Sequence, residues 1–424
     1  MYMISKKKLI ASVAILSAAL LGVSQATVAN AAGATGSIEV FSWWTSGSES
    51  AALNAIFAGL TKANPSIKIV NAAVAGGAGT NAKQVLATRL AAGDTPETWQ
   101  SHPGGDLKGY VDQSVVMDLS SLYKSQGWDK VVPKNLMDSM TYSGKTYSVL
   151  TGIHRANTLW TNKALFKKAR VTIGTNVTWA QFAAAATKLK AAGITPICLG
   201  DKDIWTAAMI LEDLIVGELG ATEFNSLAAG KASWADPKVA TVVGHFNQVL
   251  SWTNTDHKAL DWTGAVAALA NGTCAMNMMG DWAYGELLVK QGKKDGIDFG
   301  YSVIGDAKTF ITVGDSFVVG TKSKNPAGAE AFVKAIMDPK VQIAFSKLKG
   351  SSPYRTDVST ASLGAYQRAA AKVLSSGTLV ASLVHGQQLV PAAVSQAFSD
   401  GVTVLEANKD AAAFGKSMDT AAKG

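Results

Sequence analysis

The sequence is poor in the residues and patterns that build metal centres and common catalytic sites. It holds two cysteines and five histidines in 424 residues, and the histidines show neither i, i+4 pairing nor metal-ligand clustering. The motifs Gly-x-Ser-x-Gly and His-Glu-x-x-His are both absent. Beyond the first thirty residues, no apolar run approaches the length of about eighteen that a membrane-spanning helix needs. We therefore expect neither a metal site nor a membrane span, and nothing in the sequence signals catalysis.

The two cysteines each fall inside a predicted strand, Cys198 in 196–199 and Cys274 in 274–278. An oxidising compartment permits a disulfide between them if the two strands are neighbours. The alternative is two separate buried thiols, since free cysteine is among the most buried residue types. The sequence leaves both open, and we favour the separate thiols.

Charge is sparse as well. Charged residues make up 17% of the chain, with a net charge of +8 and no long basic run. Basic patches interleaved with aromatic residues, which are typical of nucleic-acid binding, are absent. The positive excess is read as a solvated surface, and no nucleic-acid partner is expected.

The first 31 residues have the pattern of a secretory signal peptide. Lys6, Lys7 and Lys8 form a positive segment, 9–22 are apolar, and Ala29-Asn30-Ala31 fits the cleavage site. These residues hold three lysines and no acid, so the net charge falls from +8 to +5 without them. No cysteine stands near the cleavage site, which argues against a lipoprotein anchor. We expect an exported protein that is free in the periplasm.

The rest of the chain, roughly 390 residues, exceeds what one hydrophobic core supports and predicts two domains. Strand and helix signals alternate, which predicts open α/β sheets with largely parallel strands flanked by helices. Passages between the two lobes are expected in 142–152 and 301–314. The predicted domains are 37–150 with 306–345 for the N-terminal lobe, and 151–305 with 346–424 for the C-terminal lobe.

Local signals place several helices. Ser46-x-x-Glu49 and Thr178-x-x-Gln181 are capping-box patterns. The first predicted helix stops at Asn64-Pro65, and another begins at Asn325-Pro326 with proline in its first position. The segment 77–82 is a loose match to a dinucleotide fingerprint, but the acid expected after the next strand is missing. We interpret it as a glycine turn and expect no cofactor.

Two adjacent tryptophans, Trp43 and Trp44, follow the predicted strand 38–41. Open α/β sheets bind ligands in the crevice beyond the carboxyl ends of their strands. An indole face matches the flat C–H face of a sugar ring, while its N–H can still find a hydrogen-bond partner. Burial of both rings in a core is the alternative.

Other segments share this mixture of aromatic or apolar residues with polar side chains at a predicted strand end or turn. They contain Trp43, Trp44 and Glu49; Gln100 and His102; Asp261 and Trp262; Asp281 and Trp282; Asp315; Lys349; and His385. Sugar hydroxyls both donate and accept hydrogen bonds, and charged partners strengthen these bonds. Each segment alone is weak evidence, because any of these residues could serve only a structural role.

Taken together, the segments resemble the sugar-binding proteins of bacterial ABC importers, extracellular solute-binding family 1, and within it the glucose/mannose-type group. The resemblance spans the mature chain in the family's order. It is carried by 40–44, 76–79, 100–102, 153–157, 279–283, 315–317, 348–351 and 382–386.

The resemblance implies a two-lobed periplasmic-binding-protein fold that closes around one sugar. It implies sugar-binding roles for Trp43, Trp44, Glu49, Gln100, His102, Trp262, Trp282, Asp315, Lys349 and His385. Segment 200–206 departs from the family pattern, so Trp205 is assigned no more than a wall of the site. His154 and Arg155 match closely and are assigned either to the sugar or to the hinge.

The resemblance further implies a monomer that binds a monosaccharide, D-glucose foremost, and delivers it to the membrane permease of an ABC transporter, without enzymatic activity. A binding protein for a short oligosaccharide and a secreted carbohydrate-active enzyme are the alternatives.

Overall fold

The computed structural model describes residues 33–76 and 79–423. The expected signal peptide and residues 77–78 of the expected glycine turn lie outside this range. The described residues from 34 onward form one compact unit, which contains two separate main sheets. In the part of the chain that the structure describes, no helix has the length and apolar character needed to cross a membrane.

The first main sheet has the strand order β13-β12-β3-β1-β2, and β6 also pairs with β12. Its strands are β1 (Gly36–Phe41), β2 (Ile67–Asn71), β3 (Thr98–Ser101), β6 (Ser148–Arg155), β12 (Thr309–Val319) and β13 (Thr378–Ala381). β1 runs parallel to β2 and β3, whereas β12 runs antiparallel to β3 and β6. Because β12 also runs parallel to β13, the sheet is mixed, with β12 and β13 running opposite to the other four strands.

The second main sheet has the order β8-β11-β7-β10-β9. Its strands are β7 (Leu159–Asn162), β8 (Asn176–Val177), β9 (Thr195–Ile197), β10 (Cys274–Met278) and β11 (Phe299–Ile304). β7 is antiparallel to both β10 and β11, while β9 runs parallel to β10 and β8 parallel to β11. A short hairpin of β4 (Thr141–Tyr142) and β5 (Lys145–Thr146) stands apart.

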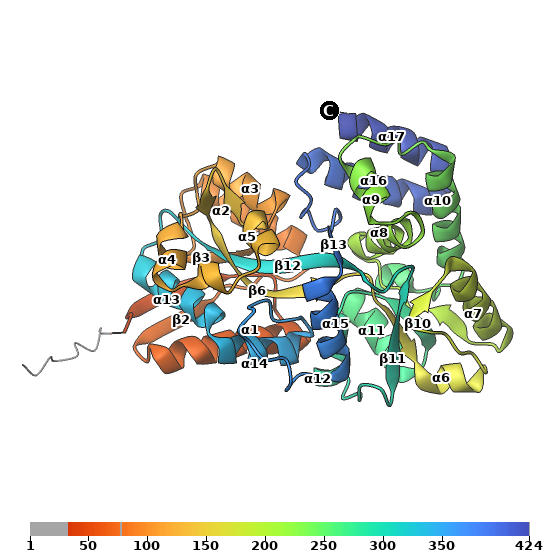
Figure 1. The fold of residues 1–424 in the computed structure, drawn as a ribbon, viewed down its shortest axis with the longest axis horizontal. Helices are drawn as coiled ribbons and strands as arrows, with labels where there is room; N and C mark the ends of the chain where they lie inside the picture. The colour runs from red at the N-terminus through yellow and green to blue at the C-terminus, as the bar shows by residue number, and fades with distance from the viewer. Residues whose placement is uncertain (1–32, 77–78, 424) are drawn as a thin grey trace, which may run out of the picture. The chain divides into compact units, whose positions relative to one another are not determined.

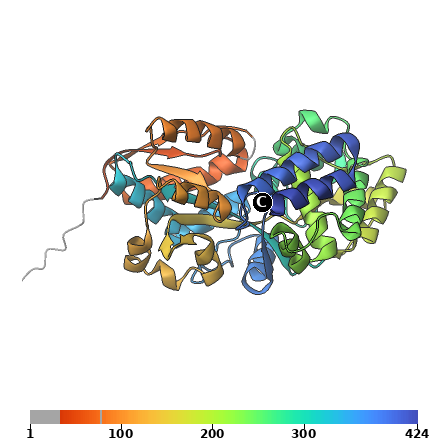
Figure 2. The ribbon, with the colours of Figure 1, turned by 90° about the horizontal axis from the view of Figure 1, so that it is seen from above.

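Helices cover both sheets (Figure 1; Figure 2). Those in the first part of the chain are α1 (Gly47–Ala63), α2 (Thr80–Ala91), α3 (Gly105–Asp112), α4 (Ser120–Ser125) and α5 (Lys134–Ser139). The middle of the chain forms α6 (Lys163–Lys168), α7 (Trp179–Ala191), α8 (Trp205–Leu219), α9 (Ala221–Ala228), α10 (Pro237–Leu250), α11 (Trp262–Asn271) and α12 (Trp282–Val289). The last part forms α13 (Pro326–Met337), α14 (Pro339–Lys349), α15 (Ala365–Ser376), α16 (Ala392–Asn408) and α17 (Ala411–Lys423). α1, α13 and α14 pack together beside the first sheet, and α16 and α17 pack against α8 and α10.

The chain passes between the sheets at 156–158, between β6 and β7, and at 305–308, between β11 and β12. Both places lie in or next to the predicted passages. β13 falls in 346–424, the segment assigned to the C-terminal lobe, yet it pairs with β12 in the first sheet.

The helix-end signals give a mixed result. Thr178 and Gln181 form the predicted capping box, and Asn325 caps α13 by accepting a hydrogen bond from the Gly328 N–H. Ser46 precedes α1 but makes no side-chain cap, so the capping box predicted there is wrong. Glu49, the acid that would complete that box, instead contacts Lys349.

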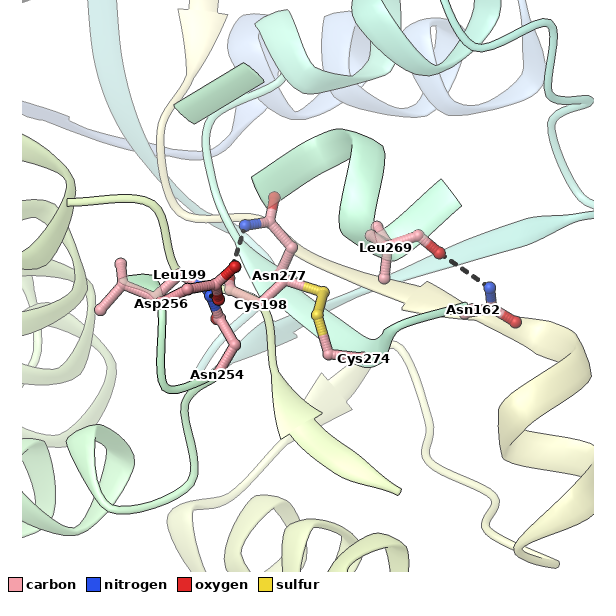
Figure 3. The surroundings of a disulfide bond; sticks show 8 residues. All are labelled: Asn162, Cys198, Leu199, Asn254, Asp256, Leu269, Cys274 and Asn277. Carbon is pink, nitrogen blue, oxygen red and sulfur yellow. Dashed lines mark hydrogen bonds between the residues drawn. A yellow bond between two sulfur atoms is a disulfide. The ribbon is translucent and has the colours of Figure 1, made fainter. Parts of the chain in front are cut away.

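The two cysteines are joined, which corrects the expectation of separate thiols. Cys198 and Cys274 form a disulfide with a Cα–Cα distance of 5.4 Å (Figure 3). β9 and β10 are parallel neighbours, and the register pairs Met276 with Ile197. The Cys198 N–H donates to the Met276 carbonyl, and the Asn277 amide donates to the Cys198 carbonyl. This pairing brings the two sulfurs together, and it links residues too distant in sequence for a local pattern to reveal.

Candidate functional site

A cavity of about 430 Å³ gathers side chains that follow strands of both sheets. Its size lies within the range of roughly 300–1,000 Å³ typical of small-molecule sites. From the first sheet and its helices come Trp43, Trp44, Thr45, Ser46, Glu49, Ala75, Gly76, Gly79, Asn81, His102, Val313, Asp315 and Lys349. From the loops and helices after β9, β10 and β13 come Lys202, Asp203, Trp205, Asp261, Trp262, Thr263, Trp282 and His385.

Nine of the ten residues predicted from the sequence line this cavity, and Gln100 is the exception. Gln100 lies directly behind it, where its amide donates to Asp315 Oδ1 at 2.9 Å and its oxygen accepts from the Trp43 N–H at 3.2 Å. Gln100 therefore orients two lining residues. Whether any of the ten contacts a sugar stays a prediction.

The tryptophan pair is more deeply buried than a stacking platform needs to be. Trp43 is 9% exposed and Trp44 is fully buried, packed against Phe317 and Phe345. Lys349 Nζ lies 5.3 Å from the centre of the Trp44 ring. Trp44 thus forms both the cavity floor and part of the core.

Gly79 brings the backbone close to the other indole. It is the N-cap residue of α2 with φ +100°, a conformation that side chains disfavour, and a Cβ there would lie 2.8 Å from the Trp43 ring. Glycine at this position therefore allows the backbone to approach Trp43 closely at one side of the cavity.

Lys349 and Glu49 form an ion pair at the cavity. The distance from Lys349 Nζ to Glu49 Oε1 is 2.8 Å, and the lysine side chain is 3% exposed. The same ammonium lies 5.9 Å from the Trp282 ring centre. One cation therefore contacts two indoles, Trp44 beside the first sheet and Trp282 beside the second. A buried ion pair provides both donors and an acceptor for hydroxyl groups.

Asp315 is the central acceptor. It lies on β12 beside a register shift in the pairing with β6, and its side chain is 6% exposed. Burial raises its pKa to about 6, against the opposing effect of Lys349. His102 Nε2 and His154 Nε2 lie 3.7 Å and 3.6 Å from its two oxygens. Burial lowers the pKa of both imidazoles well below the ordinary value, so they are neutral.

His154 and Arg155 do not line the cavity. His154 is hydrogen-bonded to Asp281 through Nδ1, and the Arg155 N–H donates to the same carboxylate at 3.0 Å. The Arg155 guanidinium donates to the carbonyl of Ala307 in the second passage between the sheets and to that of Thr309 at the start of β12. Both residues therefore contact segments at or next to the passages between the sheets, and a role in the hinge stays a prediction.

Trp205, Lys202 and Asp203 line the cavity from the loop after β9. The Trp205 ring lies 6.0 Å from that of Trp282 and 5.8 Å from that of His385. Trp205 was predicted only as a wall, and the two polar residues, Lys202 and Asp203, were not predicted from the sequence. The available signal was a polar turn following a predicted strand, the same pattern that marked the other segments.

Two indole N–H groups in the cavity wall, those of Trp44 and Trp205, are buried and find no hydrogen-bond partner among the described residues. Buried donors are nearly always satisfied in native proteins. In the described ranges no cluster of His, Cys, Asp and Glu suits a metal ion.

Comparison with known proteins identifies the family. The model of the bacterial extracellular solute-binding proteins matches residues 44–343, and the chain belongs to this family. A probable sugar-binding periplasmic protein of Brucella melitensis is 34% identical over 375 residues, which cover 86% of this chain and 87% of the relative. An uncharacterised ABC transporter extracellular-binding protein of Pyrococcus horikoshii is 32% identical over 375 residues, 88% of this chain and 84% of the relative.

Among solved structures, the bacterial solute receptor AcbH, described as having an exclusive preference for β-D-galactopyranose, matches with a TM-score of 0.80. At 17% identity it covers 92% of this chain and 99% of its own. The two-lobed solute-binding fold predicted from the resemblance is thereby confirmed.

Proposed function

We propose that this chain is the sugar-binding component of an ABC importer and that it holds a monosaccharide, D-glucose foremost, in the cavity between its two lobes. The observation that carries the proposal is the convergence of Trp43, Trp282, Asp315 and the Glu49–Lys349 pair on one cavity. Indoles suit the apolar face of a pyranose, and the charged groups suit its hydroxyls. The names of the relatives support a sugar ligand and an ABC transporter.

The mechanism follows from the two passages between the sheets. We assign 37–150 with 306–345 to one lobe and 151–305 with 346–424 to the other, except that the end of β6, the end of α14 with Lys349, and β13 go with the first sheet. A sugar that contacts both lobes binds the closed arrangement better and shifts the population toward it. The closed form, a monomer in the periplasm, then docks on the permease, which releases the sugar for import.

Calorimetric titration with D-glucose, D-mannose, D-galactose, D-xylose and maltose tests the ligand. We expect one-to-one binding of D-glucose and a change in intrinsic tryptophan fluorescence, because several indoles lie at the cavity. Tighter binding of maltose would replace the monosaccharide with a short oligosaccharide. Turnover of aryl glycosides would contradict a pure binding role.

Lys349→Met is expected to weaken glucose binding by at least about tenfold, because it removes a charged donor and leaves Glu49 without its partner. Lys83→Met is the matched control. Lys83 Nζ also lies over an indole, 5.7 Å from Trp43, and pairs with Asp106, but Lys83 does not line the cavity. Calorimetry on both variants checks this prediction. If Lys349→Met bound glucose as tightly as the wild type, Lys349 would not be part of the site.

A further inference from the structure

Glu212 is a carboxylate in the middle of the apolar helix α8, with no exposed surface. A buried carboxylate is costly unless hydrogen bonds compensate it. Its partners all lie in the segment after β13. The Ser382 hydroxyl donates to Oε2 at 2.8 Å, and the N–H groups of Leu383 and Val384 donate to Oε1 at 2.5 and 3.3 Å. This segment also carries His385, which lines the cavity.

The Ser382 hydroxyl has three neighbours, and their chemistry fixes every proton when Glu212 is ionised. A hydroxyl donates one hydrogen bond and accepts two. A carboxylate only accepts, so the Ser382 proton points to Glu212. The His385 backbone N–H only donates, and at 3.2 Å it uses one lone pair of the Ser382 oxygen. The remaining lone pair faces His385 Nδ1 at 3.0 Å, so that nitrogen must carry a proton.

The consequence for the cavity lies at the other ring nitrogen. Burial lowers the pKa of His385 to about 3, so the ring is neutral and carries a single proton. With that proton on Nδ1, Nε2 is an acceptor only. We propose that Glu212, acting through Ser382, holds His385 in the Nδ1–H tautomer and so makes the cavity select a ligand hydroxyl that donates to Nε2.

The ligand in this proposal rests on the proposed function. The tautomer does not, because it is a property of the protein alone. It makes Glu212 and Ser382 positioning residues for specificity. Glu212→Gln provides a sharp test. Leu383 and Val384 require an oxygen acceptor, so the new amide nitrogen must face Ser382 and donate to it. The Ser382 proton is then free to point at Nδ1, and His385 switches to the Nε2–H tautomer.

The first experiment is nitrogen NMR of histidine-labelled protein without sugar, with His385 assigned by His385→Gln. It is recorded at pH 8, because burial raises the pKa of Glu212 to about 7 and the carboxylate is ionised above it. We expect Nδ1–H in the wild type and Nε2–H in Glu212→Gln. Glu218→Gln is the matched control, since Glu218 lies on the same helix and contacts His245 instead. It is expected to change the His245 signal only.

An Nε2–H tautomer in the wild type, or an unchanged tautomer in folded Glu212→Gln, would overturn the proposal. If Glu212→Gln does not fold, Ser382→Ala answers the same question by removing the acceptor of Nδ1–H, and an unchanged pure Nδ1–H signal there would be equally decisive.

The second experiment measures binding of D-glucose and its monodeoxyfluoro analogues, in which fluorine keeps weak acceptor character but cannot donate. At one ring position we expect the wild type to bind the fluoro analogue about tenfold more weakly than glucose, and the gap to close in Glu212→Gln. Equal losses in both proteins would overturn the selectivity. If D-glucose does not bind at all, the proposed function is wrong. The tautomer measurement needs no sugar and still tests the role of Glu212.

Discussion

Asp315→Asn is expected to weaken glucose binding roughly 10- to 100-fold, the cost of losing a charged hydrogen-bond acceptor at the centre of the cavity. The substitution keeps the size and shape of the side chain, and the oxygen that accepts from Gln100 can stay in place. Asp106→Asn is the control. Asp106 accepts from the His102 N–H at 3.0 Å and pairs with Lys83, close to the cavity but not lining it. Equal affinity of Asp315→Asn and the wild type would contradict the assigned role.

The same substitution is expected to make the empty protein no less stable, and at pH 8 more stable. Burial raises the pKa of Asp315 from 3.8 to about 6, so the folded state holds a proton that the unfolded chain releases earlier. The protonated Asp315 carboxyl therefore contributes its full share to the free energy of unfolding below about pH 4, and this share is lost as the pH rises through 6. Above that pH the ionised group costs at most roughly 3 kcal/mol of unfolding free energy, which asparagine avoids. Urea unfolding at pH 5 and pH 8 measures the difference.

The pH dependence of binding has the opposite sign. The carboxylate is the better acceptor, so glucose affinity should fall as the pH drops from 8 to 5 and Asp315 takes up its proton. In Asp315→Asn the part of this fall due to residue 315 disappears. The neighbouring imidazoles do not titrate in this window, because burial lowers their pKa values. A stable but weakly binding variant would show that the site is maintained at the expense of stability.

The helices were predictable because their end signals are local. Asn64 ends α1 just before Pro65, and Pro326 begins α13, since proline lacks the N–H that a helix interior needs. The strand directions were not predictable in the same way. β12 pairs antiparallel with β6, which brings Asp315 opposite Gly152, and no local pattern reports a partner that distant. The failed capping box has the same origin, because Glu49 is held by a lysine 300 residues away.

The sequence pattern that located the site has a structural cause. Polar and aromatic residues that follow strands converge at one edge of a sheet. Combined with the family resemblance, that pattern located nine lining residues. The pattern could not distinguish residues that line the cavity from residues that orient them, so Gln100 was placed in the cavity rather than behind it. Nor could it report depth, and Trp44 proved to be as much core as wall. The loop carrying Asp203 and Trp205 was obscured because distant contacts shape it, including that of Asp201 with His257.

Removing the disulfide is the second change from which we expect a large effect. The bond closes a loop between residues 76 apart in sequence. Loop-closure entropy assigns such a cross-link roughly 4 kcal/mol of stabilisation, chiefly by restricting the unfolded chain. Cys198→Ala/Cys274→Ala should therefore unfold at a clearly lower urea concentration than the wild type. Reductant should lower the stability of the wild type toward that of the double variant and leave the double variant unchanged.

The bond also joins the two strands that lead into one wall of the cavity. β9 is followed by Lys202 and Trp205, and β10 by Trp282. Loosening this pair should weaken glucose binding as well, because the wall would have to be ordered when the sugar binds. Stability and affinity are separable here. A variant that loses stability but keeps its affinity would show that strand pairing alone positions the wall, while an unchanged unfolding midpoint would show that the cross-link does not stabilise the fold.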